Sequence, residues 1–353
     1  MKIFRIVLTG GPCAGKTTYL NYIKESFKKN NINCIVVPEA ATLLSNKGFD
    51  PREWKAMDFQ RMVLERELYE EREIAKYINE FGSKCDPLVI IYDRGICDNR
   101  AYLDRQDEYH SLLLEYRLDG MQVLDSYDMV FDLLSMATCK PSAYTTLNNE
   151  ARKEKRDFAK KLDKKTSNAW ANHRNMKIIS GNCSIEEEAN NILHYVYDFL
   201  NGNNVIETEK FLVDERNSNF NEFGEMETIT ITDTYLKIYN DNNIYRLSKR
   251  AGFGCSYTLD VFTYKDGKKN IKSSKVISKD SYNTFYNSFE HIGQEVRREY
   301  NFVDNETLYR LCFYGGETIL EVQKNDFNDI IIPDYIKVVG RDDNNHLVRK
   351  LCK

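Results

Sequence analysis

The segment Gly10-Gly11-Pro12-Cys13-Ala14-Gly15-Lys16-Thr17 fits the pattern GxxxxGK[ST] at every fixed position. Glycines in this pattern let the backbone wrap a polyphosphate, and successive N–H groups supply positive potential. We expect Lys16 to reach the β- and γ-phosphates and the Thr17 hydroxyl to bind Mg²⁺. The segment, with Thr18, therefore predicts a site for ATP or GTP with Mg²⁺, and no motif that reads the base distinguishes the two nucleotides.

Two acidic residues follow other apolar segments of the chain. Asp93 comes directly after Leu88–Tyr92, and Glu39 follows Cys34–Val37 after a single proline. At the end of a neighbouring strand, Asp93 would hold the magnesium ion or its water. Glu39 would face a substrate in the crevice, as a general base. The alternatives are that Asp93 merely begins a loop and that Glu39 is a charge at a helix N-terminus.

A basic stretch, Arg152-Lys153-Glu154-Lys155-Arg156, falls between the fourth and fifth apolar segments. Kinases place a mobile lid there, and its arginines neutralise the phosphoryl group in transfer. We therefore add Arg152 and Arg156 to Lys16, Glu39 and Asp93 as the predicted catalytic residues. The alternative is a solvated helix face.

The elements that must position these residues are five short apolar runs and the helical segments between them. Continuous apolar runs are typical of parallel strands covered on both faces. The longest helical pattern spans about residues 53–79, and the last spans 185–200. Residues 1–200 therefore predict an α/β fold with a doubly wound parallel sheet, whose strands are Ile3–Leu8, Cys34–Val37, Leu88–Tyr92, Met129–Leu133 and Met176–Ile179.

The pattern of apolar and polar residues changes after a turn-forming linker at residues 201–204. Residues 205–353 alternate apolar and polar side chains, which predicts an antiparallel β domain, with one helix near Ser281–His291 and a tight hairpin at Tyr314–Glu317. Charged side chains recur at period two along these strands and would line a closed barrel. The predicted metal ligands there are Glu207, Glu209 and Glu321, and the predicted anion-binding residues are Lys210, Arg246, Lys249, Arg250, Lys265, Arg297, Arg298 and Arg310. The alternative is a β-sandwich with a polar outer face.

Four segments of the first domain carry a family resemblance: TGGPCAGKTT, VPEAA, YDRG and NNEARKEKRDFA. Together they resemble the P-loop domain shared by the NadR ribosylnicotinamide-kinase group and the TRPL-translocation-defect proteins. The Pro-Glu-Ala and Asp-Arg-Gly elements are also similar to those of deoxynucleoside kinases. The resemblance implies that a kinase acting on a nucleoside or on ribosylnicotinamide is one reading of the chain.

The charged series of the second domain resembles the CYTH, or triphosphate tunnel, superfamily. That resemblance implies an antiparallel tunnel that binds triphosphates with Mg²⁺ or Mn²⁺ and often hydrolyses them. Two departures matter: Lys210 arrives one residue early, which puts Phe211 on the face of the glutamates, and Gln323 stands in place of a second late glutamate. Both changes weaken metal binding more than phosphate binding, so we expect this domain to bind an anion rather than turn it over efficiently.

A P-loop domain followed by a CYTH-like domain is the arrangement of the TRPL-translocation-defect family, which the chain resembles nearly end to end. The resemblance implies nucleotide binding coupled to a phosphorylated ligand, such as a triphosphate or a phosphatidic-acid-like lipid, and peripheral contact with membranes. Two hypotheses follow. The chain is an NTPase or phosphotransferase, or it is a nucleotide-switched binding protein without significant turnover.

Composition sets the remaining expectations. The net charge of −4 provides no general attraction to nucleic acid, and the nine cysteines form no CxxC pair. We expect reduced thiols, no nucleic-acid partner and a cytoplasmic location, because no apolar stretch is long enough to span a bilayer. The sequence gives no indication of oligomeric state.

Overall fold

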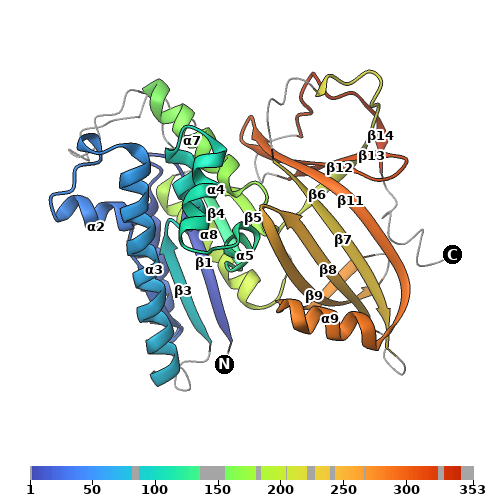
Figure 1. Cartoon of the computed structure of the whole chain (residues 1–353), viewed down its shortest axis with the longest axis horizontal. Coiled ribbons are helices and arrows are strands. Elements are labelled where there is room, and N and C mark those ends of the chain that lie inside the picture. Colours follow the sequence, from blue (N-terminus) through green and yellow to red (C-terminus); the bar gives the residue numbers. More distant parts are fainter. Residues whose placement is uncertain are drawn as a thin grey trace. The chain divides into compact units, whose positions relative to one another are not determined.

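The computed structural model describes residues 2–81, 87–135, 156–179, 184–203, 205–220, 227–238, 243–265, 268–324 and 330–342. The chain forms two compact units. Unit 1 comprises Met1–Leu118 and Ser126–Tyr197, and unit 2 comprises Asp119–Asp125 and Asp198–Lys353. Figure 1 shows the elements of each unit.

Unit 1 is built on a five-stranded parallel sheet with the order β2-β3-β1-β4-β5. Each strand lies within one residue of its predicted bounds at either end, so the parallel sheet is confirmed. Strand β4, residues Leu88–Tyr92 of β3 and the second half of β1 are buried, as their continuous apolar sequences require. The strands are β1 (Ile3–Thr9), β2 (Asn33–Val37), β3 (Leu88–Asp93), β4 (Met129–Leu133) and β5 (Met176–Ile179).

Helices connect the strands of unit 1, and α3 is the long helix that runs beside the sheet in Figure 1. Helix α1 packs on the sheet through Tyr19, Leu20, Ile23 and Phe27, which recur at helical spacing on one face. The helices are α1 (Lys16–Lys29), α2 (Ala40–Asn46), η1 (Pro51–Glu53), α3 (Ala56–Phe81), η3 (Ile96–Tyr102), α4 (Gln106–Glu115), α7 (Arg156–Trp170) and α8 (Ile185–Leu200).

The strand order fixes where a ligand can bind in unit 1. After β1 the chain passes to the edge strand β2, returns through β3, and then crosses to β4 on the other side of β1. In open α/β sheets, ligands bind at the carboxyl ends of the strands where the winding reverses. The carboxyl end of β1 is such a point, and the residues that follow it are Gly10–Thr17.

Unit 2 contains a nine-stranded antiparallel sheet with the order β10-β9-β8-β7-β11-β12-β13-β6-β14. The antiparallel domain is thus confirmed, but no closed barrel is found: within the described residues β10 and β14 remain edge strands and do not pair with each other. The strands are β6 (Thr208–Val213), β7 (Thr228–Lys237), β8 (Ile244–Gly252), β9 (Gly254–Lys265), β10 (Lys268–Val276), β11 (Glu290–Asp304), β12 (Thr307–Phe313), β13 (Thr318–Gln323) and β14 (Val338–Arg341).

One face of this sheet carries two apolar clusters. Helix α9 (Lys279–Ser288) covers the first, where Tyr282 packs against Leu236, Leu247 and Tyr257. The second is centred on the buried side chains of Phe211, Tyr300, Phe302, Tyr309, Leu311, Leu320, Val322 and Ile336. The predicted hairpin at Tyr314–Glu317 joins β12 to β13, with the N–H of Tyr314 donating to the Glu317 carbonyl over 2.9 Å.

Unit 2 also includes a short segment from the middle of the sequence, which contains helix α5 (Gly120–Asp125). The buried carboxylate of Asp125 forms an ion pair with Arg250 and accepts a hydrogen bond from Ser256. Asp119 accepts a hydrogen bond of 2.9 Å from the N–H of Cys255. A Cβ at Gly254, where φ is +101°, would lie 2.1 Å from an Asp119 oxygen, so the β8–β9 turn requires glycine there.

None of the helices in the described parts of the chain is long and apolar enough to cross a membrane.

Candidate functional site

The loop between β1 and α1 has the backbone shape that the predicted phosphate cradle requires. Gly10 and Gly15 have φ values of +134° and +77°, and Cys13 also has a positive φ, of 59°. A Cβ at Gly10 would lie 2.0 Å from the carbonyl oxygen of Leu133, so no other residue fits. Helix α1 begins directly after this loop at Lys16, and its N-terminus therefore faces any bound anion.

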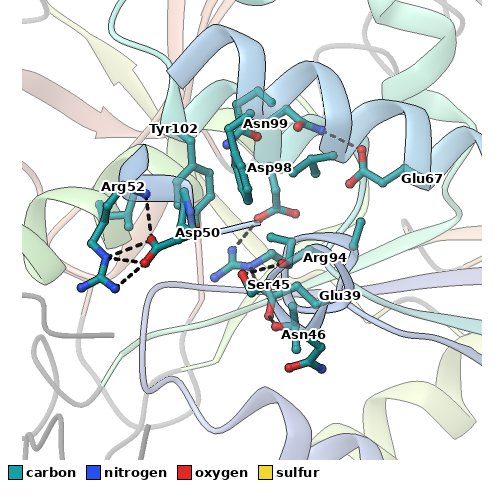
Figure 2. Close-up of a pocket in the computed structure, with 18 of the residues that line it drawn as sticks. Glu39, Ser45, Asn46, Asp50, Arg52, Glu67, Arg94, Asp98, Asn99 and Tyr102 are labelled. Atoms are coloured by element: carbon teal, nitrogen blue, oxygen red, sulfur yellow. Dashed lines mark hydrogen bonds and ion pairs between the residues drawn. The ribbon is translucent and has the colours of Figure 1, made fainter. Parts of the chain in front are cut away.

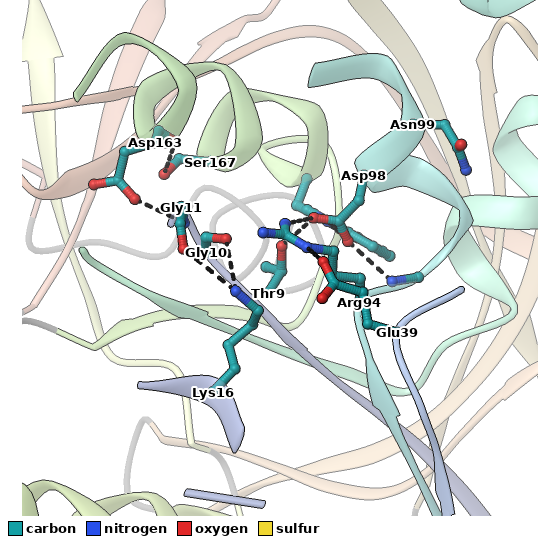
Figure 3. A network of polar contacts seen from close by, with 12 residues as sticks. Thr9, Gly10, Gly11, Lys16, Glu39, Arg94, Asp98, Asn99, Asp163 and Ser167 are labelled. Atoms are coloured by element: carbon teal, nitrogen blue, oxygen red, sulfur yellow. Dashed lines mark hydrogen bonds and ion pairs between the residues drawn. The ribbon is translucent and has the colours of Figure 1, made fainter. Parts of the chain in front are cut away.

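Lys16 is folded back over the loop in this structure. Its Nζ donates to the carbonyls of Gly10 and Gly11, over 3.2 and 3.3 Å (Figure 3). The Thr17 side chain is exposed and makes no hydrogen bond with a described residue, so its hydroxyl is available to a metal ion. The Thr18 side chain is also exposed, and its N–H donates to the Gly15 carbonyl as part of the first helical turn.

Helix α7 contacts the phosphate-binding loop through Asp163. One oxygen of this buried carboxylate accepts the N–H of Gly11 over 2.9 Å, and the carboxylate also accepts the N–H of Ser135 over 3.2 Å. The sequence analysis missed Asp163, because it lies 152 positions from Gly11 and matches no motif. We infer that α7 fixes the position of the loop.

A chain of charged side chains connects the end of β1 to the end of β2. Asp98, which is 3% exposed, accepts hydrogen bonds from Thr9 Oγ1 over 2.5 Å and from Arg94 Nη1 over 3.0 Å. Arg94, at a positive φ of 70°, in turn donates its Nε to Glu39 over 2.7 Å. Asp98 also accepts the N–H of Gly95 over 2.9 Å and the indole N–H of Trp170 over 3.2 Å. Figure 3 shows Arg94 between the two carboxylates.

Asp93, which the sequence analysis predicted as a ligand of the magnesium ion or its water, and Asp98, which it did not predict, have different surroundings in the structure. Asp93 lines a small cavity together with Glu67, Glu70 and Glu71 of α3. Asp98 lies next to the cradle and contacts Thr9, the last residue of β1. Sequence reasoning missed Asp98 because η3, which carries it, follows the strand by several residues instead of ending it.

A cavity of about 730 Å³ opens beside this charged network (Figure 2). Glu39, Arg94 and Asp98 line it, so the network that contacts the cradle also forms part of the cavity wall. The other walls come from α2, η1, α3, η3 and α7, and they include Ala40, Asp50, Arg52, Phe59, Gln60, Val63, Glu67, Asn99, Tyr102, Phe158 and Leu162. A cavity of this size is typical of a site for a small molecule.

Asp132 is a further buried carboxylate beside the cradle. It pairs with Thr9 in the register of β1 and β4, and both of its oxygens are buried, with the Ser167 hydroxyl nearby. Burial, and after it the negative charge of Asp163, raises the pKa of Asp132 to about 8. The group is therefore mostly uncharged at neutral pH.

The predicted lid arginines cannot be placed. Arg152 lies outside the described residues, and so does the side chain of Arg156, the first residue of α7. Further along the same helix, Phe158 and Leu162 line the cavity.

In unit 2, period-two alternation separates the predicted tunnel residues into two groups. Cross-strand pairing puts Lys210 opposite Glu321, Glu321 opposite Arg310, and Arg246 opposite Asp260. Side chains of directly paired residues share one face of a sheet. By the same pairing Arg250, Arg297 and Glu321 lie on this face, which we call the charged face, whereas Lys249, Arg298 and Glu209 point to the other side. The side chain of Lys265 lies outside what the structure describes.

The cations of the charged face are paired with carboxylates. Lys210 Nζ lies 2.5 Å from Glu321, and Arg297 contacts Asp233 at 2.6 Å and Glu299 at 2.7 Å. Burial alone would raise the pKa of Asp233, but its arginine neighbours, Arg246 and Arg297, lower that pKa to about 2. An anion that binds here must therefore compete with carboxylates that are already in place.

The predicted metal ligands of unit 2 are not brought together. Glu321 pairs with Lys210 on the charged face, and Glu209 pairs with Lys324 and Arg341 on the other. Glu207 precedes β6, and its carbonyl accepts the N–H of Lys324. Within the described residues no group of three or more Asp, Glu, His or Cys side chains could hold a metal ion.

Three comparisons with known proteins bear on this architecture. No protein with a curated description matches the chain. A solved structure, that of the PH1012 protein from Pyrococcus horikoshii OT3, is 14% identical and covers 35% of this chain and 80% of its own, with a TM-score of 0.26. A TM-score this low supports no conclusion about fold or activity.

The family comparison covers the part of the chain that contains the cradle. Residues 5–188 match the family model described as AAA domain, which is more than half of the sequence. The matched range begins in β1 and includes the P-loop, the charged network and all five strands of the parallel sheet. With a nucleotide-binding P-loop at the carboxyl end of its central strand, this chain belongs to the AAA domain family.

Proposed function

We propose that unit 1 is a phosphotransferase, which moves the γ-phosphoryl group of a bound ATP or GTP to a hydroxyl of a small molecule in the 730 Å³ cavity. The observation that carries this proposal is the network Thr9–Asp98–Arg94–Glu39, because it joins the end of the strand that leads into the cradle to the wall of the cavity. A protein that only hydrolyses nucleotide has no need of a second cavity there.

Glu39 is the general base of the proposed reaction. Its carboxylate is held by Arg94 Nε at 2.7 Å and by the Thr42 hydroxyl at 2.6 Å, and 11% of its side chain is exposed. An arginine contact favours the charged carboxylate, which is the form that accepts a proton from a hydroxyl. Such a base contributes typically about 10²- to 10⁴-fold to the rate.

Lys16 and Thr17 are the proposed ligands of the terminal phosphates and the metal. The Thr17 hydroxyl is exposed without a described partner, and Lys16 can exchange two neutral carbonyls for phosphate oxygens, so the residues fit a nucleotide with Mg²⁺. When bound, Mg²⁺ would neutralise charge on the β- and γ-oxygens. Arg152 and Arg156 remain proposed lid residues, and Asp93 remains a proposed ligand of the metal or its water.

The test is phosphorus NMR of the full chain with MgATP or MgGTP and one acceptor at a time. Acceptors would include nucleosides and ribosylnicotinamide, and Glu39→Gln would be compared with Glu25→Gln, an exposed glutamate of α1. We expect transfer to one acceptor class, a loss of about 10²-fold or more in Glu39→Gln, and full activity in Glu25→Gln. Nucleotide hydrolysis at the same rate with and without every acceptor would contradict the proposal.

A second function is proposed for unit 2, as a module that binds a phosphorylated ligand such as a triphosphate or an anionic lipid headgroup. What favours it is the alternation that directs Lys210, Arg246, Arg297 and Arg310 to the charged face. Because carboxylates already neutralise several of these cations, we expect weak binding of the anion. Lipid binding is tested by sedimentation of the full chain with phosphatidic-acid vesicles, compared with phosphatidylcholine vesicles, and equal sedimentation with both would reject an anionic lipid as the ligand. Triphosphate binding is tested by calorimetry with inorganic triphosphate, and the absence of a binding signal would reject that ligand.

A further inference from the structure

Glu67 is a partly buried carboxyl group on the wall of the 730 Å³ cavity, and no step proposed above uses it. It lies on the same face of α3 as Gln60 and Val63, which also line the cavity. Figure 2 shows it beside Asn99, away from Asp50 and Arg52. A carboxyl group that a bound ligand would seal from water is costly unless it is neutral or has a partner.

The hydrogen bonds of Asn99 determine how the Glu67 carboxyl group is oriented. Asn99 Nδ2 donates to the carbonyl of Ile96 over 2.9 Å, and this contact fixes the amide with its NH₂ group on that side. The same Nδ2 donates to Glu67 Oε2 over 2.7 Å. Oε2 is therefore an acceptor, and the other oxygen, Oε1, makes no hydrogen bond with a described residue.

The surroundings of Glu67 favour the neutral form of its carboxyl group. Burial is the largest effect, and together with the negative charges of Asp98 and Glu71 it outweighs the hydrogen bond from Asn99 and the positive charge of Arg94. The result is a pKa of about 8 for Glu67. In the neutral form the proton is carried by Oε1, because Oε2 accepts from Asn99.

We infer that Glu67 is a specificity-determining residue, which donates a hydrogen bond from Oε1 to a carbonyl oxygen or ring nitrogen on the edge of the bound acceptor. This inference rests on the proposed function, because it concerns the molecule that receives the phosphoryl group. It narrows the acceptor to an uncharged polar molecule with such an edge, held between Glu67 at one end and Glu39 near the reacting hydroxyl. A site built to hydrogen-bond a ligand group rejects analogues that lack it.

Glutamine is the informative replacement for Glu67. Its oxygen can accept from Asn99 as Oε2 does, and its NH₂ group then donates into the cavity at every pH. Glu67→Gln therefore imitates the neutral acid, whereas Glu67→Ala removes the donor altogether. Circular dichroism and binding of MgATP would establish that both variants are folded.

The experiment measures phosphorylation and the dissociation constants of cytidine, adenosine and a riboside that carries a phenyl ring in place of the base. The phenyl riboside keeps the sugar hydroxyls and the flat ring but has no acceptor on the ring edge. If only the neutral form of Glu67 binds, a pKa of about 8 predicts that affinity for cytidine or adenosine falls about thirtyfold between pH 6.5 and pH 9.5. We expect that fall in the native chain, no such fall in Glu67→Gln, and weak binding at both pH values in Glu67→Ala.

The outcomes separate this inference from the proposed function. If cytidine or adenosine is phosphorylated and Glu67→Gln shows the same pH dependence as the native chain, the inference fails and the phosphotransferase stands. The same holds if the phenyl riboside is phosphorylated as well as the natural nucleosides, or in their place. If MgATP binds and none of the three is phosphorylated, the role of Glu67 is rejected, and the phosphotransferase proposal is decided by the wider panel of acceptors described above.

Discussion

Replacing Asp98 with asparagine should destabilise unit 1 much more than its small change in shape suggests. Oδ1 of Asp98 accepts from Thr9 and Arg94, and Oδ2 accepts from Gly95 and Trp170. Asparagine retains one oxygen, so two of these four donors would face an NH₂ group whichever way the amide is turned.

The expected magnitude follows from the burial of these groups. Each buried donor left without a partner costs about 1–3 kcal/mol, so Asp98→Asn should cost roughly 2–6 kcal/mol of unfolding free energy. With a urea dependence of about 2 kcal/mol per M, the midpoint of the unit 1 transition should fall by roughly 1–3 M. That loss is a large fraction of the ~5–15 kcal/mol typical of a folded domain.

Tryptophan emission during urea unfolding would measure this change, because Trp170 is fully buried and donates to Asp98, whereas Trp54 is 44% exposed. The matched control is Asp107→Asn, which makes the same substitution in a pair with Arg105 whose side chains are 64% and 70% exposed. Exposed ion pairs contribute about 0–1 kcal/mol, so the control should barely move. If both variants shift the midpoint equally, the network around Asp98 does not stabilise unit 1 as we argue.

Three further predictions follow from the same structure. Lys16→Ala should weaken MgATP binding strongly in calorimetry because it removes the ammonium group for the terminal phosphates, whereas Lys24→Ala, on the exposed side of α1, should not. Burial raises the pKa of Asp132 from 3.8 to about 8, so the stability linked to its neutral form is fully present only below pH 3.8 and is lost progressively as the pH rises from there through 8. The urea midpoint should therefore fall from pH 5 to pH 8 and level off above pH 8, and the fall should be smaller in Asp132→Asn. Glu321→Gln should remove the counter-ion of the Lys210 ammonium and cost roughly 1–3 kcal/mol, less than a fully buried pair because the Lys210 side chain is 30% exposed. An added Lys210→Met should restore much of that loss in urea unfolding, and no recovery would mean that the loss does not come from the Lys210–Glu321 pair.

The parallel sheet and the cradle could be predicted because their signals are local. Five apolar runs define the strands, and the residues from Gly10 to Thr17 are contiguous, so spacing alone identifies the loop. The partners of that loop are not contiguous with it. Asp163 contacts Gly11 of the loop from 152 positions away, and Asp98 contacts Thr9, just before the loop, from 89 positions away. Nothing in the sequence around either residue marks it as a partner.

In unit 2, alternation was enough to predict strands but not how the sheet ends. The side of each charged residue follows from period two, and the prediction that Lys210 leaves the face of Glu209 agrees with its pairing to Glu321. Closure depends on whether the first and last strands meet, which no pattern within a single strand specifies. The pairing of basic residues with carboxylates such as Asp233 and Asp260 was also missed, because each partner belongs to another strand.

The α5 segment has a consequence for how this protein is made. A ribosome completes Asp119–Asp125 long before it reaches β8 and β9, since Asp125 and its partner Arg250 are 125 positions apart. Domains usually fold in order as the chain emerges, but unit 2 has to include a piece synthesised in the middle of unit 1. A fragment that starts at residue 198 would lack the Asp125 carboxylate that pairs with Arg250, so synthesis of the complete chain is the route by which unit 2 acquires its full set of partners.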